Sequence, residues 1–234
     1  MNNAYPRSSI LSTANNFIAW QHAQISEIGG YFSLRSQNEQ LAAENTALRN
    51  RICSMDSAKN NAPIHYEQAK VVQMTTDQLH NYLTINRGSK DGIQSKQGVR
   101  NEDGVVGIVR TVGRNYSVVQ PLINTETNLS CRFAKNGYFG TLQWDGKDNR
   151  FALLTDVAAH MVVNPGDTII TSGLTTAFPE GIPVGIVENS TLREGESYYT
   201  IRVRLNTNFK RLKYVEVVQN AHQNELEELT NGMD

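Results

Sequence analysis

From Tyr66 to Val218 the sequence is a series of short apolar runs separated by turn residues, with no long stretch of helical period. Residues 105–112 and 198–205 are rich in β-branched residues, and the second run alternates apolar with polar positions, which is typical of strands. Asn136-Gly137 and Asp145-Gly146 are turn signals between such runs. Strands that recur about every ten residues predict an all-β region of barrels or sandwiches.

The length of this β region, about 150 residues, suits two small barrels. We expect the first barrel domain to span residues 66–155 and the second to span residues 156–219. Strand spacing leaves open whether the two are interleaved in sequence. Residues 1–8 form a polar leader, residues 55–65 are a linker that contains a helix-stopping proline, and residues 220–234 are a polar, acidic tail that we expect to be disordered.

The segment ahead of the linker, residues 9–54, has a period of seven and predicts a long helix. Two adjacent glycines, Gly29-Gly30, coincide with a slip in this pattern and predict a kink or a break. After them a seam re-forms, in which polar residues at two of the a positions fix register and favour a parallel dimer. The d positions of this seam are Leu34, Leu41 and Leu48, and the a positions are Asn38, Asn45 and Ile52.

A single amphipathic helix docked on its own domain is the alternative to a dimeric coiled coil. The polar run of residues 37–40 leaves no wide apolar face for such docking. The seam is also short, about three heptads, so we expect weak association unless a membrane or a partner holds the chains together.

The stretch from Val162 to Glu188 predicts two strands around a long, shaped turn. Pro183 cannot donate to a strand ladder, so it should lie at a strand start or on an edge. Phe178 is the one large aromatic residue in the connection, and we expect it to be buried in a core. The stretch supplies neither a nucleophile with its base nor a phosphate-binding loop.

This stretch resembles the C-terminal signature of the MreC family of bacterial rod-shape-determining proteins. A second block, residues 86–124, is similar to the same family, and the resemblance extends from about Leu34 to Val218. The signature residues, structural or interaction positions, are Gly166, Asp167, Thr171, Ser172, Gly173, Phe178, Pro179, Gly181, Pro183 and Gly185; Leu174, Ile182, Val184 and Val187 also match.

The resemblance implies a fold that is mainly β, with a coiled-coil stalk followed by two small β-barrel domains. It implies a non-catalytic scaffold that acts as a dimer or a filament in the cell-elongation machinery. The implied partners are the elongation class B penicillin-binding protein, RodA and MreD, with MreB bound through a segment before residue 1. Relatives carry a membrane-spanning helix ahead of an extracytoplasmic part, and we expect this sequence to begin just after such a helix.

Composition gives no argument for a nucleic-acid or membrane-surface partner, because the formal net charge is -1 and the 22 basic residues are spread along the chain. No apolar run reaches the 18 or so residues that a membrane span needs. The two cysteines, Cys53 and Cys131, do not make a disulfide framework. We expect free thiols, although a pair is possible in an oxidising compartment.

An enzyme is the first rival interpretation, because paired barrels occur in trypsin-like proteases. Ser172 could be a nucleophile only with a base from His65, His80 or His160, and none of these lies in a recognisable motif. A turn hydroxyl is the better interpretation of Ser172. The loop of residues 145–149 is similar to a calcium loop but lacks the closing glutamate, so we expect neither a metal nor a cofactor.

Contact surfaces are the remaining functional features. Phe139 and Tyr198-Tyr199 could contact a partner or pack in a core, and Arg202 and Arg204 share one strand face that could meet carboxylates or simply face solvent. An unrelated periplasmic adaptor, such as an efflux-pump subunit, is the second rival. Those adaptors insert a helical hairpin between barrel halves, whereas the single helix here is N-terminal.

Overall fold

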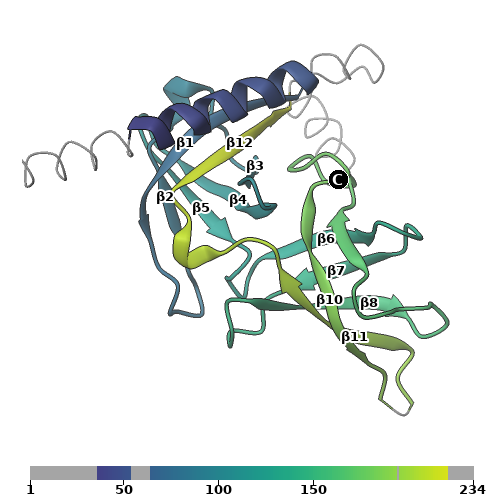
Figure 1. Cartoon of the computed structure of the whole chain (residues 1–234). Coiled ribbons are helices and arrows are strands. Elements are labelled where there is room, and N and C mark those ends of the chain that lie inside the picture. The colour runs from purple at the N-terminus through teal and green to yellow at the C-terminus, as the bar shows by residue number, and fades with distance from the viewer. Residues whose placement is uncertain (1–35, 54–63, 194, 221–234) are drawn as a thin grey trace, which may run out of the picture. The chain divides into compact units, whose positions relative to one another are not determined.

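The computed structural model describes residues 36–53, 64–193 and 195–220. The polar leader, the first part of the expected helix with Gly29-Gly30 and Leu34, most of the linker, and the acidic tail lie outside the described residues. Within them the structure has one helix, residues 36–53, and twelve strands (Figure 1).

Strands β4 and β11 coincide with the predicted runs of residues 105–112 and 198–205, and the bounds of all twelve strands follow. They are β1 (Ile64–Met74), β2 (Leu83–Ile85), β3 (Gly98–Arg100), β4 (Val105–Val112), β5 (Ser117–Pro121), β6 (Asn128–Phe133), β7 (Phe139–Gln143), β8 (Phe151–Ala158), β9 (Thr168–Thr171), β10 (Pro183–Thr191), β11 (Tyr198–Leu205) and β12 (Tyr214–Asn220). Two 3-10 turns, η1 (Ser89–Asp91) and η2 (Phe209–Arg211), lie in connections.

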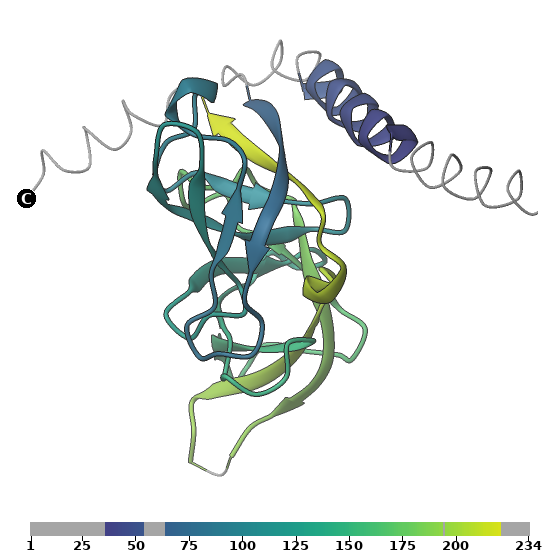
Figure 2. The same ribbon diagram turned by 90° about the vertical axis from the view of Figure 1, so that its left-hand side faces the viewer.

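The strands close into two antiparallel barrels, which confirms the expected fold class of a mainly β chain with an N-terminal helix. The order in the first barrel is β1-β12-β3-β4-β5-β2, and in the second it is β10-β11-β8-β7-β6-β9. Figures 1 and 2 show the strands of each barrel gathered together, with β12 returning to lie beside β1. Closure removes exposed strand edges.

The barrels are interleaved in sequence, and the expected boundary between residues 155 and 156 is wrong. Strands β6, β7 and β8 belong to the second barrel, and β12 belongs to the first. The reason is a long-range pairing: β12 pairs with β1, with Ile64 opposite Asn220. The second barrel is therefore an insertion between β5 and β12, which local periodicity cannot reveal.

Each barrel has a core built from the inward face of alternating strands. In β6, Leu129, Cys131 and Phe133 are buried, whereas Arg132 between them is half-buried. Burial raises the pKa of the Cys131 thiol well above its usual range. Cys131 and Cys53 are not joined by a disulfide.

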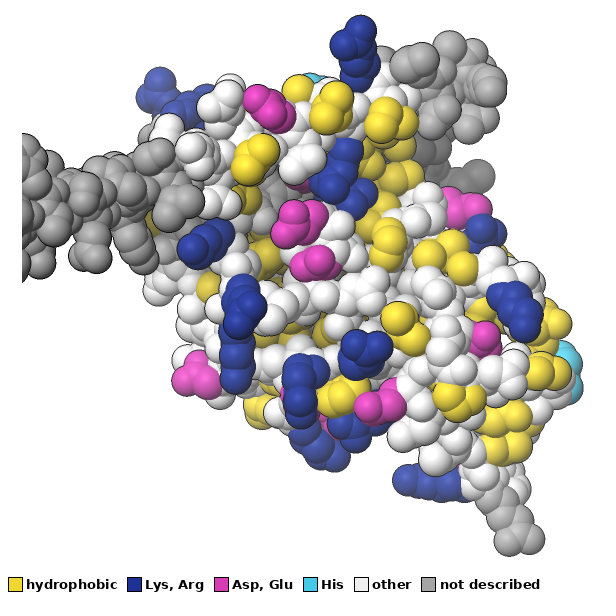
Figure 3. All heavy atoms as spheres, viewed as in Figure 1, with side chains coloured by type: hydrophobic (Ala, Val, Ile, Leu, Met, Phe, Trp, Pro, Cys, Tyr) yellow, Lys and Arg dark blue, Asp and Glu magenta, His cyan; other side chains and the backbone are white. Residues whose placement is uncertain are grey.

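The two barrels belong to one compact unit that begins at Thr46 and includes the last two turns of the helix. The connection from β11 to β12 crosses between the barrels, where Thr207 Oγ1 donates to the carbonyl oxygen of Val105 at 2.8 Å. On the face shown in Figure 3, basic and acidic side chains are interspersed, in keeping with the balanced composition.

Candidate interaction surfaces

The helix leaves its predicted seam exposed. Leu41, Leu48 and Ile52 are 57%, 57% and 60% exposed, and Asn38 and Asn45 are also exposed. Exposed large apolar residues repeated along one side of a helix mark a surface for another helix. Each described seam residue is thus accessible to solvent, and pairing of two chains remains a prediction.

The opposite side of the last two turns is polar, and it packs on the first barrel. Thr46 Oγ1 donates to one carboxylate oxygen of Glu216 in β12 at 2.8 Å, and Arg49 Nη1 donates to the other at 2.6 Å. Arg100 Nε lies 3.7 Å from this carboxylate, and Glu216 is only 6% exposed. Its charge is therefore compensated by two guanidinium groups and a hydroxyl.

The next residue along the helix, Asn50, makes a second contact with the first barrel. The side-chain amide of Asn50 donates to the carbonyl oxygen of Tyr66 at 3.0 Å and accepts from the Tyr66 N–H at 2.7 Å. Burial raises the pKa of the Tyr66 phenol, and the neighbouring Cys53 thiol raises it further. We call the contacts of Thr46, Arg49 and Asn50 with Glu216 and the Tyr66 backbone the Glu216 clamp.

Sequence reasoning missed the Glu216 clamp. Two signals could have pointed to it: the polar side chains recur at helical spacing opposite the seam, and Glu216 is an acidic residue between Val215 and Val217 in an otherwise apolar strand. A buried carboxylate needs a partner, so the position of Glu216 in this strand predicts a cationic or hydrogen-bonding partner for it.

The family signature shapes the joint between the barrels. Phe178, in the loop between β9 and β10, is 2% exposed, which confirms the prediction that it is buried. Its ring lies against Gly98 at the start of β3, where the N–H of Gly98 donates to the carbonyl oxygen of Ala177 at 3.0 Å. The loop of the second barrel therefore packs into the first.

The loop around Phe178 is held by its own side chains. Thr171 Oγ1 donates to the carbonyl oxygen of Pro179 at 2.6 Å and accepts from the N–H of Ile182 at 2.9 Å. Asp167 accepts from the N–H of Asn164 at 2.8 Å, which closes the preceding turn. Other signature residues have conformational roles. Three of the glycines have positive φ: Gly166, Gly173 and Gly181. Gly185 lies against the backbone of Arg204, and Pro183 starts β10 as predicted.

The candidate nucleophile Ser172 is engaged in this turn. Its Oγ lies 2.9 Å from Ser130 Oγ and accepts from the N–H of Leu174 at 3.2 Å. Among the candidate bases, His65 and His80 lie beside Glu67 and Glu126, at 4.0 and 3.8 Å. In the described part of the chain, no hydrogen bond joins Ser172 to His65, His80 or His160, so the geometry favours the turn hydroxyl.

The predicted contact aromatics separate into exposed and packed residues. Phe139 and Tyr198 are 50% and 57% exposed, whereas Tyr199 is half-buried. Arg202 pairs with Glu188 at 2.9 Å and stacks on the ring of Phe151 at 3.9 Å.

Those two exposed aromatics lie at the same end of the second barrel. Thr141 in β7 is opposite Thr155 in β8, and Val157 in β8 is opposite Tyr199 in β11. This register brings the start of β7 and the start of β11 to one end.

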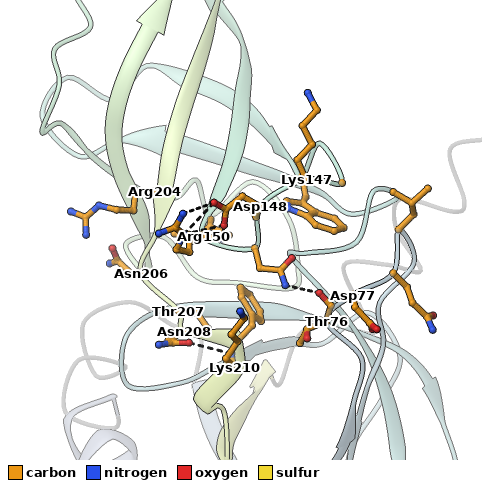
Figure 4. A pocket seen from close by; sticks show the side chains of 17 residues that line it. Thr76, Asp77, Lys147, Asp148, Arg150, Arg204, Asn206, Thr207, Asn208 and Lys210 are labelled. Carbon is orange, nitrogen blue, oxygen red and sulfur yellow. Dashed lines mark hydrogen bonds and ion pairs between the residues drawn. The ribbon is translucent and has the colours of Figure 1, made fainter.

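A cleft of about 720 Å³ lies where the β1–β2 loop, the β7–β8 loop and the β11–β12 connection meet (Figure 4). Asn149 Nδ2 donates to the carbonyl oxygen of Thr76 at 2.5 Å and ties two of these walls together. Arg150 forms a 2.7 Å ion pair with Asp148, and its hydrogen bonds lower the pKa of the Asp148 carboxyl to about 2. Lys147 and Lys210 add positive charge to the lining.

The loop of residues 145–149, considered above as a calcium loop, is one wall of this cleft. Asp145 accepts a hydrogen bond from the N–H of Lys147 at 3.2 Å, as in an ordinary turn. Within the described part of the chain, no three His, Cys, Asp or Glu side chains converge as metal ligands would.

Comparison with known proteins decides the family. A family model described as "Rod shape-determining protein MreC, barrel core" matches residues 71–219, more than half of the chain. The chain belongs to the MreC family. This membership confirms the resemblance that the signature residues indicated, and the two closed barrels confirm the pair of β-barrel domains that it implied. The coiled-coil stalk remains a prediction.

Curated MreC relatives support this membership. The cell shape-determining protein MreC of Haemophilus influenzae is 30% identical over 182 residues, which are 76% of this chain and 49% of that protein. MreC of Escherichia coli is 26% identical over 217 residues, 84% of this chain and 59% of that protein. The chain therefore spans about half of the length of the curated relatives that it matches.

Solved MreC structures share the fold. MreC from Pseudomonas aeruginosa aligns with a TM-score of 0.61 at 23% identity, over 66% of this chain and 99% of that one. MreC from Listeria monocytogenes aligns with a TM-score of 0.61 at 19% identity, over 92% and 96%. A third is described as a complex between penicillin-binding protein PBP2 and MreC from Helicobacter pylori, with a TM-score of 0.53 at 15% identity over 67% and 99%.

A membrane span would need a long apolar helix. Across residues 36–53, 64–193 and 195–220, none of the helical segments has both the length and the hydrophobicity for that role.

Proposed function

We propose that this chain is a non-catalytic scaffold of the bacterial cell-elongation machinery, which pairs with itself and organises or activates peptidoglycan synthases. Membership of the MreC family and the name of the curated relatives, cell shape-determining protein, support this function. The position of Ser172 in a hydrogen-bonded turn supports a role without catalysis.

The observation that carries the scaffold proposal is the exposed seam of the helix. Leu41, Leu48 and Ile52 remain open to solvent although the same helix contacts the first barrel through its other side. A second copy of the chain would cover these residues in a parallel coiled coil, in which Asn38 and Asn45 set the register. Pairing would place two sets of barrels side by side.

The synthase-binding surface in this proposal is the end of the second barrel that carries Phe139 and Tyr198. Aromatic residues and arginine are enriched in protein interfaces, and Arg132 lies opposite Phe139 in the β6–β7 pair. The complex of PBP2 with MreC from Helicobacter pylori makes an elongation class B penicillin-binding protein the first partner to test. RodA and MreD are further partners, with MreB reached through a segment ahead of residue 1.

This function places the barrels on the extracytoplasmic face of the inner membrane, where peptidoglycan synthases act. In this arrangement a membrane-spanning helix ahead of residue 1 anchors the chain and raises the local concentration of the short seam. Binding of the barrels would then bias the synthase toward its active conformation.

Crosslinked pull-down of the purified chain with the elongation class B penicillin-binding protein of the same organism tests the proposal. Capture is expected for the unaltered chain, and it should fall when Phe139 and Tyr198 are both changed to alanine. Tyr116→Ala is the matched control, because Tyr116 is 55% exposed on the first barrel. No capture by the unaltered chain, or equal loss with the control, would contradict the proposed surface.

A further inference from the structure

The last two turns of the helix contact the first barrel through the side that a docked helix normally leaves in water. A helix that packs on its own domain usually buries its apolar stripe. Here Leu48 and Ile52 are exposed, whereas Thr46 is 6% exposed and Arg49 and Asn50 are half-buried. Within residues 46–53, these polar side chains therefore contact the barrel, and these apolar side chains remain available for another surface.

Contact with the barrel and pairing with a second helix use different heptad positions. When Leu48 is a d position and Ile52 an a position, Thr46 is a b position, Arg49 an e position and Asn50 an f position. The b and f positions face away from the seam of a two-stranded coiled coil, and an e position only flanks it. The helix can therefore hold the barrel and a second helix at the same time.

The contacts of the Glu216 clamp are directional. Thr46 and Arg49 reach different oxygens of one carboxylate, at 2.8 and 2.6 Å. Asn50 bonds both the N–H and the carbonyl oxygen of one residue, at 2.7 and 3.0 Å. Rotation of the helix about its axis would break both sets and leave Glu216 buried beside Arg100 without its shortest donors, which is unfavourable.

We propose that the Glu216 clamp makes residues 46–53 a rigid part of the first barrel and fixes the direction in which Leu48 and Ile52 point. Pairing through this face then sets the orientation of two first barrels relative to each other. The contact of Phe178 with Gly98 extends the same constraint to the second barrel. The clamp itself lies within one chain and does not depend on pairing, whereas the orientation of two first barrels rests on the self-pairing of the proposed function.

Pulsed electron spin resonance on a spin-diluted sample tests the clamp. Labels at Ala47→Cys on the helix and Asn115→Cys in the β4–β5 turn, both exposed positions, report one intrachain distance. Cys53→Ser is present in every form, and the Cys131 thiol is buried and does not take label. An excess of unlabelled chain suppresses distances between copies, so the measurement works for a monomer and for a dimer.

The unaltered clamp should give a single narrow distance. Arg49→Ala with Asn50→Ala should abolish that narrow distance and give a broad distribution, without touching the barrel itself. Arg51→Ala, an exposed arginine two residues from Arg49, is the matched control and should keep the narrow distance. A narrow distance in the double variant, or a broad one in the unaltered clamp, would overturn the proposal.

Sedimentation of the same samples without spin dilution separates this inference from the proposed function. A monomer with a narrow distance would contradict pairing but support the clamp. A dimer with a broad distance would support pairing and contradict the clamp.

Discussion

The aromatic ring of Phe178 occupies the space that a β-carbon at Gly98 would need, and this contact joins the two barrels. Any β-carbon at position 98 would overlap that ring and the carbonyl oxygen of Ala177. Gly98 begins β3 of the first barrel, and Phe178 belongs to the β9–β10 loop of the second. Phe178, a residue of the family signature, is thus a packing residue, because Gly98 on the other barrel leaves room for its ring.

Phe178→Ala should lower the free energy of unfolding by about 3–5 kcal/mol, because it leaves a cavity at a buried site. Chemical denaturation followed by fluorescence or circular dichroism measures the change. Separate unfolding transitions for the two barrels are expected in the variant, since the joint is lost.

Leu174→Ala is the control for this prediction, because Leu174 lies in the same loop but is 69% exposed. Its effect should stay within about 0.5 kcal/mol. Gly98→Ala should also destabilise the chain, since its β-carbon would overlap the backbone carbonyl oxygen of Ala177 as well as the Phe178 ring. A Phe178→Ala variant as stable as the control would show that the ring does not contribute to stability.

Local sequence patterns predicted one half of this joint and not the other. The strands and the burial of Phe178 follow from short-range signals: period two, turn residues and one aromatic in a polar connection. The partner Gly98 lies on a strand of the other barrel, and its role depends on how β3 meets the β9–β10 loop. Local patterns also could not predict that β12 closes the first barrel, because Ile64 and its partner Asn220 are far apart in the sequence.

The Glu216 clamp escaped prediction for a different physical reason. Polar residues on the outside of an apolar seam normally face water, so the local pattern did not single out Thr46, Arg49 and Asn50. Only the position of the buried Glu216 carboxylate turns that side into a docking surface. The seam itself needed no tertiary information, since its period of seven is a local property.

Glu216→Ala should lower the free energy of unfolding by about 3–5 kcal/mol, because it removes one partner of a buried ion pair and leaves the other partners uncompensated. It leaves Arg49 and Arg100 without their shared carboxylate. Urea denaturation measures the effect.

Glu126→Ala is the matched control for the buried carboxylate. Glu126 pairs with Arg110 at 3.0 Å, but both side chains are about half exposed, and exposed ion pairs contribute about 0–1 kcal/mol. Equal effects of the two substitutions would contradict a special role for Glu216.

Asp148 should titrate at about pH 2, because hydrogen bonds from the side chain and backbone of Arg150 favour its charged form. Arg150→Ala should return its pKa toward the ordinary value of about 3.9. Because the folded pKa is lower than the unfolded one, the pair stabilises the fold above about pH 4, and this contribution is lost as the pH falls toward 2. Carboxyl NMR titration measures the pKa. Arg110→Ala is the control, because Arg110 pairs with Glu126 and not with Asp148, and it should leave the pKa of Asp148 unchanged.

Asn45→Leu should strengthen pairing of the helices by about tenfold or more, since burying a leucine side chain contributes about 1.5–3 kcal/mol. It should also loosen the choice of strand number, because an asparagine at an a position specifies a dimer at a cost in stability. Sedimentation equilibrium should show a tighter dimer mixed with higher oligomers. Leu48→Ala, which removes an exposed d residue from the same face, should weaken association. If the unaltered chain and the Asn45→Leu variant both sediment as monomers at every concentration, the exposed leucines are not a self-pairing seam, and the proposed dimer is contradicted.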